Sequence, residues 1–276
     1  MLITIAHSPD SDDIFMFWAL KTKKIPNADF DFKIMAQDIE TLNQLATKAR
    51  YDITAISMHA YAYLSNRYAL LSSGSSFAEK DWGPILVSKK KQTLSDLSKK
   101  QIAVPGLWTT AFLLLKMALP DFEPVVMKPE NILPAIQDNR VEAGLLIHEG
   151  QICYKDFGVF LIQNMIEVWK KIAGDLPLPL GGSAVKKSLG QTVMKKLSRL
   201  QKQSILFARH HFEEAKAYVR HENPVLNDQG LTKYLGWYAN DRTVDLGEDG
   251  KKALEVLFAT AFEKGLIPQK VEIEII

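Results

Sequence analysis

Short apolar runs alternate with segments of helical periodicity from the first residues onward. This order is typical of an α/β protein whose mainly parallel sheets are covered by helices. Strands are expected at residues 2–6, 30–35, 53–56, 82–87, 101–104, 124–127, 143–148, 159–162 and 176–185. Helices are expected at residues 12–20, 39–49, 111–119, 188–219, 226–237 and 250–264, and others begin near residues 57, 130 and 151.

Two of the expected strands suggest a hinge between lobes. The strand at 82–87 carries Gly83-Pro84, and the strand at 176–185 opens with alternating leucine and proline. A complete small α/β unit lies between them, so the chain enters and leaves this unit through two adjacent strands. We therefore expect a bilobal type II periplasmic-binding-protein-like α/β fold. Its large lobe would comprise residues 1–88 plus 181–276, its small lobe residues 89–180, and a substrate cleft would lie between them.

Charge and composition narrow the class of partner. The formal net charge is only +2, with 47% hydrophobic and 24% charged residues, so no strong field attracts nucleic acid or an anionic membrane surface. No apolar stretch approaches the length that spans a bilayer, and the amino terminus lacks the pattern of a signal peptide. We expect a cytoplasmic protein that binds a small molecule.

Metal and nucleotide cofactors are not expected either. Cys153 is the single cysteine, which excludes an intrachain disulfide and a Cys-x-x-Cys site. The chain has no HExxH pair, no phosphate-binding Walker loop and no GxGxxG fingerprint.

Polar side chains follow several expected strands at their carboxyl ends, where open α/β sheets bind ligands. His148 ends the strand at 143–148, Ser57 follows the strand at 53–56, and Thr109-Thr110 follow Pro105-Gly106 after the strand at 101–104. Helix capping would explain Ser57 or Thr109 alone. Taken together, these positions predict one pocket lined from both lobes.

The acidic run Asp10, Asp12 and Asp13 stands beyond the first strand. Capping of the following helix and contact with a ligand both remain open for these carboxylates. No arginine follows any of these strands, so an anionic group of the substrate would be held by helix amides and hydroxyls.

Five segments together resemble the 1,4-dihydroxy-6-naphthoate synthase family of the futalosine route to menaquinone. They are residues 8–15, 38–43, 105–111, 142–149 and 176–182, and they occur in the family's order. Some members carry Ser-Pro-Cys-Pro-Asn-Asp where this chain has Ser-Pro-Asp-Ser-Asp-Asp, which leaves the roles of Asp10 and Asp12 open.

The resemblance implies a lyase that converts cyclic dehypoxanthine futalosine to 1,4-dihydroxy-6-naphthoate and a sugar-derived fragment. It further implies that His148 accepts a proton as a general base, in the neutral form near pH 7. The residues that it implies as substrate contacts are Ala55, Ile56, Ser57, Thr109 and Thr110; we add Asn43, from the matching segment 38–43, and Asp12, for sugar hydroxyls.

Two alternatives share the expected fold. One is a small-molecule binding protein without catalytic activity, and the other is chorismate dehydratase, the sister enzyme of the pathway. Whether the chain forms a homodimer is left open by the sequence.

Overall fold

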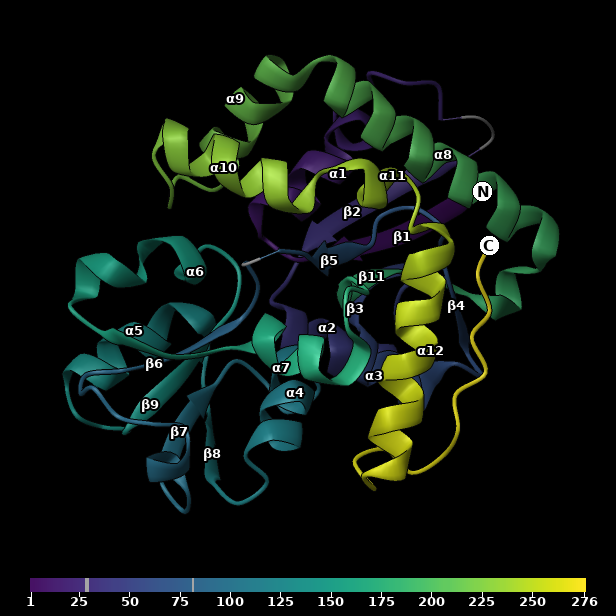
Figure 1. The fold of residues 1–276 in the computed structure, drawn as a ribbon. Helices are drawn as coiled ribbons and strands as arrows, with labels where there is room; N and C mark the ends of the chain where they lie inside the picture. Colours follow the sequence, from purple (N-terminus) through teal and green to yellow (C-terminus); the bar gives the residue numbers. More distant parts are fainter. Residues whose placement is uncertain (28–29, 81) are drawn as a thin grey trace.

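The computed structural model describes residues 1–27, 30–80 and 82–276, which form two mixed sheets with helices on their faces (Figure 1). The first sheet has six strands and the second has five. In spatial order, the first sheet comprises β2 (Asp31–Ala36), β1 (Leu2–His7), β3 (Ile53–Ser57), β11 (Leu178–Lys186) and β4 (Tyr68–Leu70), with β5 (Ser76–Ala78) also paired to β11. The second sheet comprises β10 (Phe160–Asn164), β6 (Ile85–Ser88), β9 (Ala143–Leu146), β7 (Gln101–Val104) and β8 (Glu123–Val126).

We call the parts built on these two sheets the first and the second lobe. The chain leaves the first lobe after β5 and returns to it at β11, and these two strands pair, with Leu178 opposite Ala78. The two crossings therefore lie side by side, as the hinge interpretation requires. The bilobal α/β fold is confirmed. β6 belongs to the second sheet, although it lies within the predicted range 1–88; Gly83-Pro84, directly before it, is where the chain leaves the first lobe.

Twelve α-helices of the described chain cover these sheets. In the first lobe they are α1 (Ser11–Lys21), α2 (Ile39–Ala46), α3 (Met58–Leu64), α8 (Gln191–His210), α9 (Phe212–Glu222), α10 (Asp228–Tyr238), α11 (Asp241–Val244) and α12 (Gly247–Glu263). In the second lobe they are α4 (Thr110–Ala118), α5 (Pro129–Gln137), α6 (Gly150–Cys153) and α7 (Met165–Ala173). Three short 3-10 turns lie at Ser95–Leu97, Tyr154–Phe157 and Lys187–Leu189. None of the helices in the described ranges is long and apolar enough to cross a membrane.

Three expectations from the sequence need correction. The sheets are mixed rather than mainly parallel, because β11 runs antiparallel to β3 and β6 runs antiparallel to β9. The helix expected at residues 188–219 is broken at His211, whose backbone leaves the helical region while its ring stacks on Phe207 at 4.0 Å. The strand expected at 143–148 ends at Leu146, so His148 lies in the turn beyond it.

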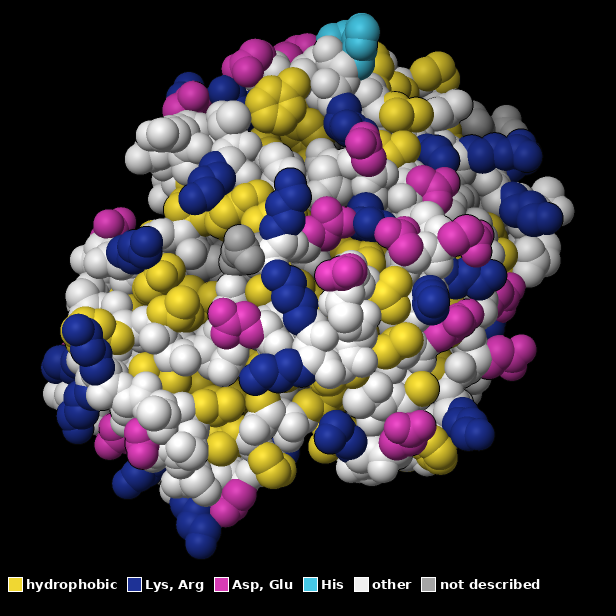
Figure 2. Space-filling view, viewed as in Figure 1, with side chains coloured by type: hydrophobic (Ala, Val, Ile, Leu, Met, Phe, Trp, Pro, Cys, Tyr) yellow, Lys and Arg dark blue, Asp and Glu magenta, His cyan; other side chains and the backbone are white. Residues whose placement is uncertain are grey.

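The hydrophobic core continues from one lobe into the other. One cluster of buried side chains includes Ile56 of β3, Leu113 of α4, Trp169 of α7 and Phe258 of α12. On the face shown in Figure 2, acidic and basic side chains are interspersed, which agrees with the low net charge. Packing thus holds in place the elements that carry the loops following β1, β3, β7 and β9.

Candidate active site

A cavity lies between the lobes, beside the carboxyl ends of β1, β3, β7 and β9. It has about 670 Å³ of space free of protein atoms, part of which is open solvent at its mouth. The predicted residues that line it are Asp12, Ala55, Ile56, Ser57, Thr109, Thr110 and His148. The topology therefore brings together side chains from both lobes, as expected.

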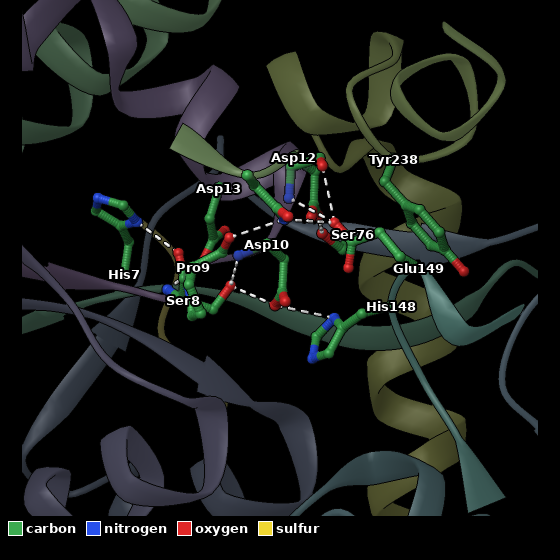
Figure 3. Close-up of polar contacts among 12 residues, drawn as sticks. His7, Ser8, Pro9, Asp10, Asp12, Asp13, Ser76, His148, Glu149 and Tyr238 are labelled. Atoms are coloured by element: carbon green, nitrogen blue, oxygen red, sulfur yellow. Dashed lines mark hydrogen bonds and ion pairs between the residues drawn. The ribbon is translucent and has the colours of Figure 1, made fainter. Parts of the chain in front are cut away.

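Asp10 and His148 form the closest charged contact in this cavity. The Asp10 Oδ2 atom lies 2.9 Å from His148 Nδ1, and Ser8 Oγ donates to the same carboxylate at 2.5 Å. The Asp10 side chain is 11% exposed and the His148 side chain 24%. The second ring nitrogen of His148 points away from Asp10 (Figure 3). This leaves one nitrogen oriented by the carboxylate and the other free for a ligand.

The backbone of His148 is held in an uncommon conformation. Its φ angle is 53°, in the left-handed region, which is rare for residues other than glycine and concentrates at functional sites. This turn follows β9 directly and aims the imidazole back toward the first lobe, where Asp10 lies at the start of α1.

The charge of His148 differs from the expectation. Burial alone would lower the pKa of His148, but the negative charge of Asp10 and its hydrogen bond raise the pKa to about 9. The predicted neutral imidazole at pH 7 is therefore wrong, because the charge of Asp10 beside the ring favours the imidazolium. The sequence could not show this because Asp10 and His148 meet only in the folded chain.

Two further carboxyl groups line the cavity from α1. Asp12 accepts hydrogen bonds from Ser76 Oγ at 2.8 Å and from Tyr234 OH at 3.2 Å, and Asp13 accepts from the Ser8 amide at 2.7 Å. Burial and the charge of neighbouring aspartates raise the pKa of Asp12, and raise that of Asp13 to about 8. Within the described residues, no group of three or more His, Cys, Asp or Glu side chains could hold a metal ion.

The raised pKa of Asp13 predicts a pH-dependent cost to stability. An unfolded aspartate ionises near pH ~3.9, whereas folded Asp13 keeps its proton up to about pH 8. Stability is therefore lost as pH rises between these two values, by up to about 1.4 kcal/mol per pH unit. We expect Asp13→Asn, which stays neutral and can still accept from Ser8, to melt at a higher temperature than the native chain at pH 8. At pH 4 the two melting temperatures should converge, and a constant difference across this range would contradict the assignment.

The opposite lobe supplies the hydrogen-bond donors. The Thr109 hydroxyl caps α4 by accepting from the Phe112 amide, and the Thr110 hydroxyl donates to the Leu180 carbonyl at 2.5 Å. Both hydroxyls are thus engaged within the protein. The amides of Thr110 and Ala111 make no hydrogen bond to the described residues, as is usual in the first turn of a helix. Together with the imidazolium of His148, they can donate to an anionic group; none of the described residues that line the cavity is lysine or arginine.

Asn43 does not line the cavity. It is fully buried, its amide donates to Ser57 Oγ at 3.0 Å, and its carbonyl accepts from the Ser57 amide at 2.9 Å. The prediction that Asn43 contacts the substrate directly is therefore wrong. Asn43 instead positions Ser57, which faces the cavity.

The sequence left the roles of three carboxylates open, and the structure gives Asp10 a partner, His148. Helix capping explained an aspartate at this position equally well, yet its side chain makes no capping bond to α1. Its position one residue before that helix was visible in the sequence, but its contact with a side chain 138 positions away was not.

Comparison with known proteins agrees with this architecture. Residues 3–263 match the model of a family described as "Menaquinone biosynthesis". The 1,4-dihydroxy-6-naphthoate synthase of Thermus thermophilus is 33% identical over 264 residues, which cover 96% of this chain and 95% of that protein. The enzyme of the same name from Streptomyces coelicolor is 31% identical over 272 residues, with the same coverage.

Solved structures show the same fold. A protein from Archaeoglobus fulgidus superposes with a TM-score of 0.90 at 41% identity and covers 96% of this chain and 98% of its own. The alkanesulfonate-binding protein of Xanthomonas axonopodis pv. citri, at 13% identity, gives a TM-score of 0.73 over 98% and 95% of the two chains. The second likeness concerns the fold alone and confirms the periplasmic-binding-protein-like architecture. By the family match and by its relatives over nearly their full length, the chain belongs to the menaquinone-biosynthesis family that includes the 1,4-dihydroxy-6-naphthoate synthases.

Proposed function

We propose that the protein is a carbon–carbon lyase that converts cyclic dehypoxanthine futalosine to 1,4-dihydroxy-6-naphthoate and a sugar-derived fragment. The observation that carries this proposal is the Asp10–His148 pair, which lies in the cavity between the lobes. Membership of a family of menaquinone-biosynthesis enzymes supports it.

In this proposal His148 is the general base. Asp10 orients the imidazole through Nδ1, so that the free ring nitrogen takes a proton from a substrate hydroxyl. The carbon that bears this hydroxyl becomes a carbonyl as its bond to the neighbouring carbon breaks. The electrons of the broken carbon–carbon bond then pass into the adjacent carbonyl system as an enolate, and aromatisation of the new ring supplies driving force. Base catalysis of this kind typically contributes about 10²–10⁴-fold. The raised pKa makes His148 a stronger base that is present in its active form mainly at alkaline pH.

The charges on the two walls of the cavity determine how the substrate is oriented. Ionised Asp10 repels a carboxylate from the wall formed by α1, whereas the amides of Thr110 and Ala111 and the dipole of α4 attract it. We therefore place the substrate carboxylate against α4, beside Ser57. Sugar hydroxyls would face Asp12, which can accept or donate a hydrogen bond.

The proposal also covers the lobe bounds, the location, the cofactors and the partners of the protein. We propose the two expected lobes, 1–88 plus 181–276 and 89–180, with two changes: β6 moves to the second lobe and the start of β11 moves to the first. We further propose a cytoplasmic location and turnover without a metal or nucleotide cofactor. A small-molecule substrate is then the principal partner, and a homodimer remains compatible with the surface.

Incubation of the purified protein with cyclic dehypoxanthine futalosine tests the proposal. We expect 1,4-dihydroxy-6-naphthoate to accumulate, detected by liquid chromatography and mass spectrometry, with none formed in the absence of protein. Binding of the compound without product would favour a binding protein instead. Dehydration of chorismate by the same preparation would favour the sister enzyme.

A further inference from the structure

We infer that two glutamates, Glu40 and Glu149, clasp the lobes together and thereby assemble the Asp10–His148 pair. Each lobe contributes one of these carboxylates, and each carboxylate is bound by donors that belong to the other lobe. Only the kinetic part of this inference rests on the proposed function; the clasp itself is a property of the protein without substrate.

Glu149 extends from the second lobe, directly after His148, to the first. Its Oε1 atom accepts from the Ser11 amide at 3.1 Å, from Ser11 Oγ at 2.8 Å and from Asn223 Nδ2 at 2.9 Å. Ser11 is the first residue of α1 and Asn223 caps the end of α9. The carboxylate thus lies at the amino terminus of α1, where the helix dipole favours negative charge.

Glu40 makes the reciprocal contact from α2 of the first lobe. Its two carboxylate oxygens accept from the amides of Leu107 and Trp108, each at 3.2 Å. These amides belong to the loop between β7 and α4 of the second lobe. A Cβ atom at residue 106 would overlap with the Glu40 carboxylate, so the glycine there permits the approach.

Both glutamates are buried, each residue being 7% exposed. Burial raises the pKa of both groups, and their hydrogen bonds act in the opposite direction. Buried carboxylates would be costly without these donors, and the donors come from the facing lobe. Separation of the lobes would therefore return both groups to water and break all five hydrogen bonds.

The catalytic pair has the same arrangement. Asp10 belongs to the first lobe and His148 to the second, so their 2.9 Å contact exists only while the lobes are closed. Glu149 is adjacent to His148, and the loop held by Glu40 leads into α4, whose amides line the cavity. Glu40 and Glu149 are accordingly positioning residues: they bring the reacting groups together without touching the reacting atoms.

Glu40→Ala tests the clasp at a distance from His148. We expect the amide hydrogens of Leu107 and Trp108 to exchange about 10- to 100-fold faster than in the native protein, since their bonds to a charged acceptor are lost. Glu40→Gln, which retains one carbonyl acceptor, should give an intermediate rate. Gly106→Ala, which displaces the carboxylate, should resemble Glu40→Ala. Glu130→Ala is the matched control, because Glu130 is an exposed carboxylate in the first turn of α5 and takes no part in the contacts of Glu40 or Glu149. Leu107 and Trp108 should exchange at the native rate in this variant.

The titration of His148, followed by NMR in the same variants, tests the link to the catalytic pair. We expect its midpoint in Glu40→Ala to fall below the native value of about 9, because loss of one of the two contacts weakens the approach of the imidazole to Asp10 while Glu149 still holds the neighbouring residue. With substrate, kcat should fall in this variant more than KM rises, with partial recovery in Glu40→Gln.

Unchanged amide exchange in a folded Glu40→Ala variant would overturn the clasp. Faster exchange with an unchanged His148 titration would overturn its role in assembling the pair. Neither amide exchange nor the His148 titration requires turnover. If the native protein fails to release naphthoate, the proposed function is refuted, and these two measurements still test the clasp.

Discussion

Replacement of His148 by alanine should leave a folded protein whose kcat for naphthoate release is lower by about 10²–10⁴-fold. The reason is that Asp10 orients the imidazole of His148, whose second ring nitrogen is free to accept a proton. The cavity, the α4 amides and the carboxylates of α1 remain in this variant, so KM should change much less than kcat. Steady-state kinetics with product detection measures both.

His148→Asn provides a second variant that separates chemistry from backbone strain. Asparagine tolerates the left-handed conformation at φ 53° better than alanine does. We expect it to be as inactive as His148→Ala but to melt closer to the native temperature. His210→Ala, at an exposed position at the end of α8, should retain full activity. Near-native turnover in either His148 variant would refute the base role.

Asp10→Asn should shift the pH dependence of kcat/KM toward acid. In the native protein His148 must lose its proton to act as a base, so kcat/KM should rise with pH and level off above about pH 9. Without the Asp10 charge the raised pKa is lost, and the plateau should begin near or below pH ~6.5. The plateau itself should be lower by about 10- to 100-fold, because the imidazole is then a weaker and less well oriented base.

The pH dependence of kcat/KM also distinguishes two roles of His148, general base and general acid. A general base gives activity that rises with pH, whereas an imidazolium acting as an acid gives activity that falls through the same pKa. An unchanged midpoint in Asp10→Asn would show that another group titrates. Ser8→Ala, which removes a donor to Asp10 but leaves its charge, should move the midpoint much less.

The parts of the site that the sequence predicts are those set by local structure. Ser57, Thr109 and His148 each stand just beyond a strand, and strand ends meet at one edge of an α/β sheet regardless of side-chain detail. The pocket from two lobes could therefore be predicted, and so could the absence of arginine from it. The Gly-Pro and Leu-Pro segments likewise marked the crossings between lobes.

The parts that could not be predicted depend on contacts between distant segments. Asp10 meets His148, Glu149 meets Ser11 and Glu40 meets the loop after β7, each across the closed cleft. A carboxylate before a helix is compatible with capping, with a ligand or with such a contact, and only the folded chain decides. The neutral state assigned to His148 was wrong for this reason, and the substrate contact assigned to Asn43 was wrong because that side chain turns inward to Ser57.

The most direct measurement is a crystal structure of His148→Asn soaked with cyclic dehypoxanthine futalosine, since an inactive variant should retain the intact compound. The account predicts that the compound occupies the cavity between the lobes, with its carboxylate at the amides of Thr110 and Ala111 and its scissile bond beside residue 148. A compound bound with its carboxylate at Asp12, or bound outside this cavity, would contradict the account.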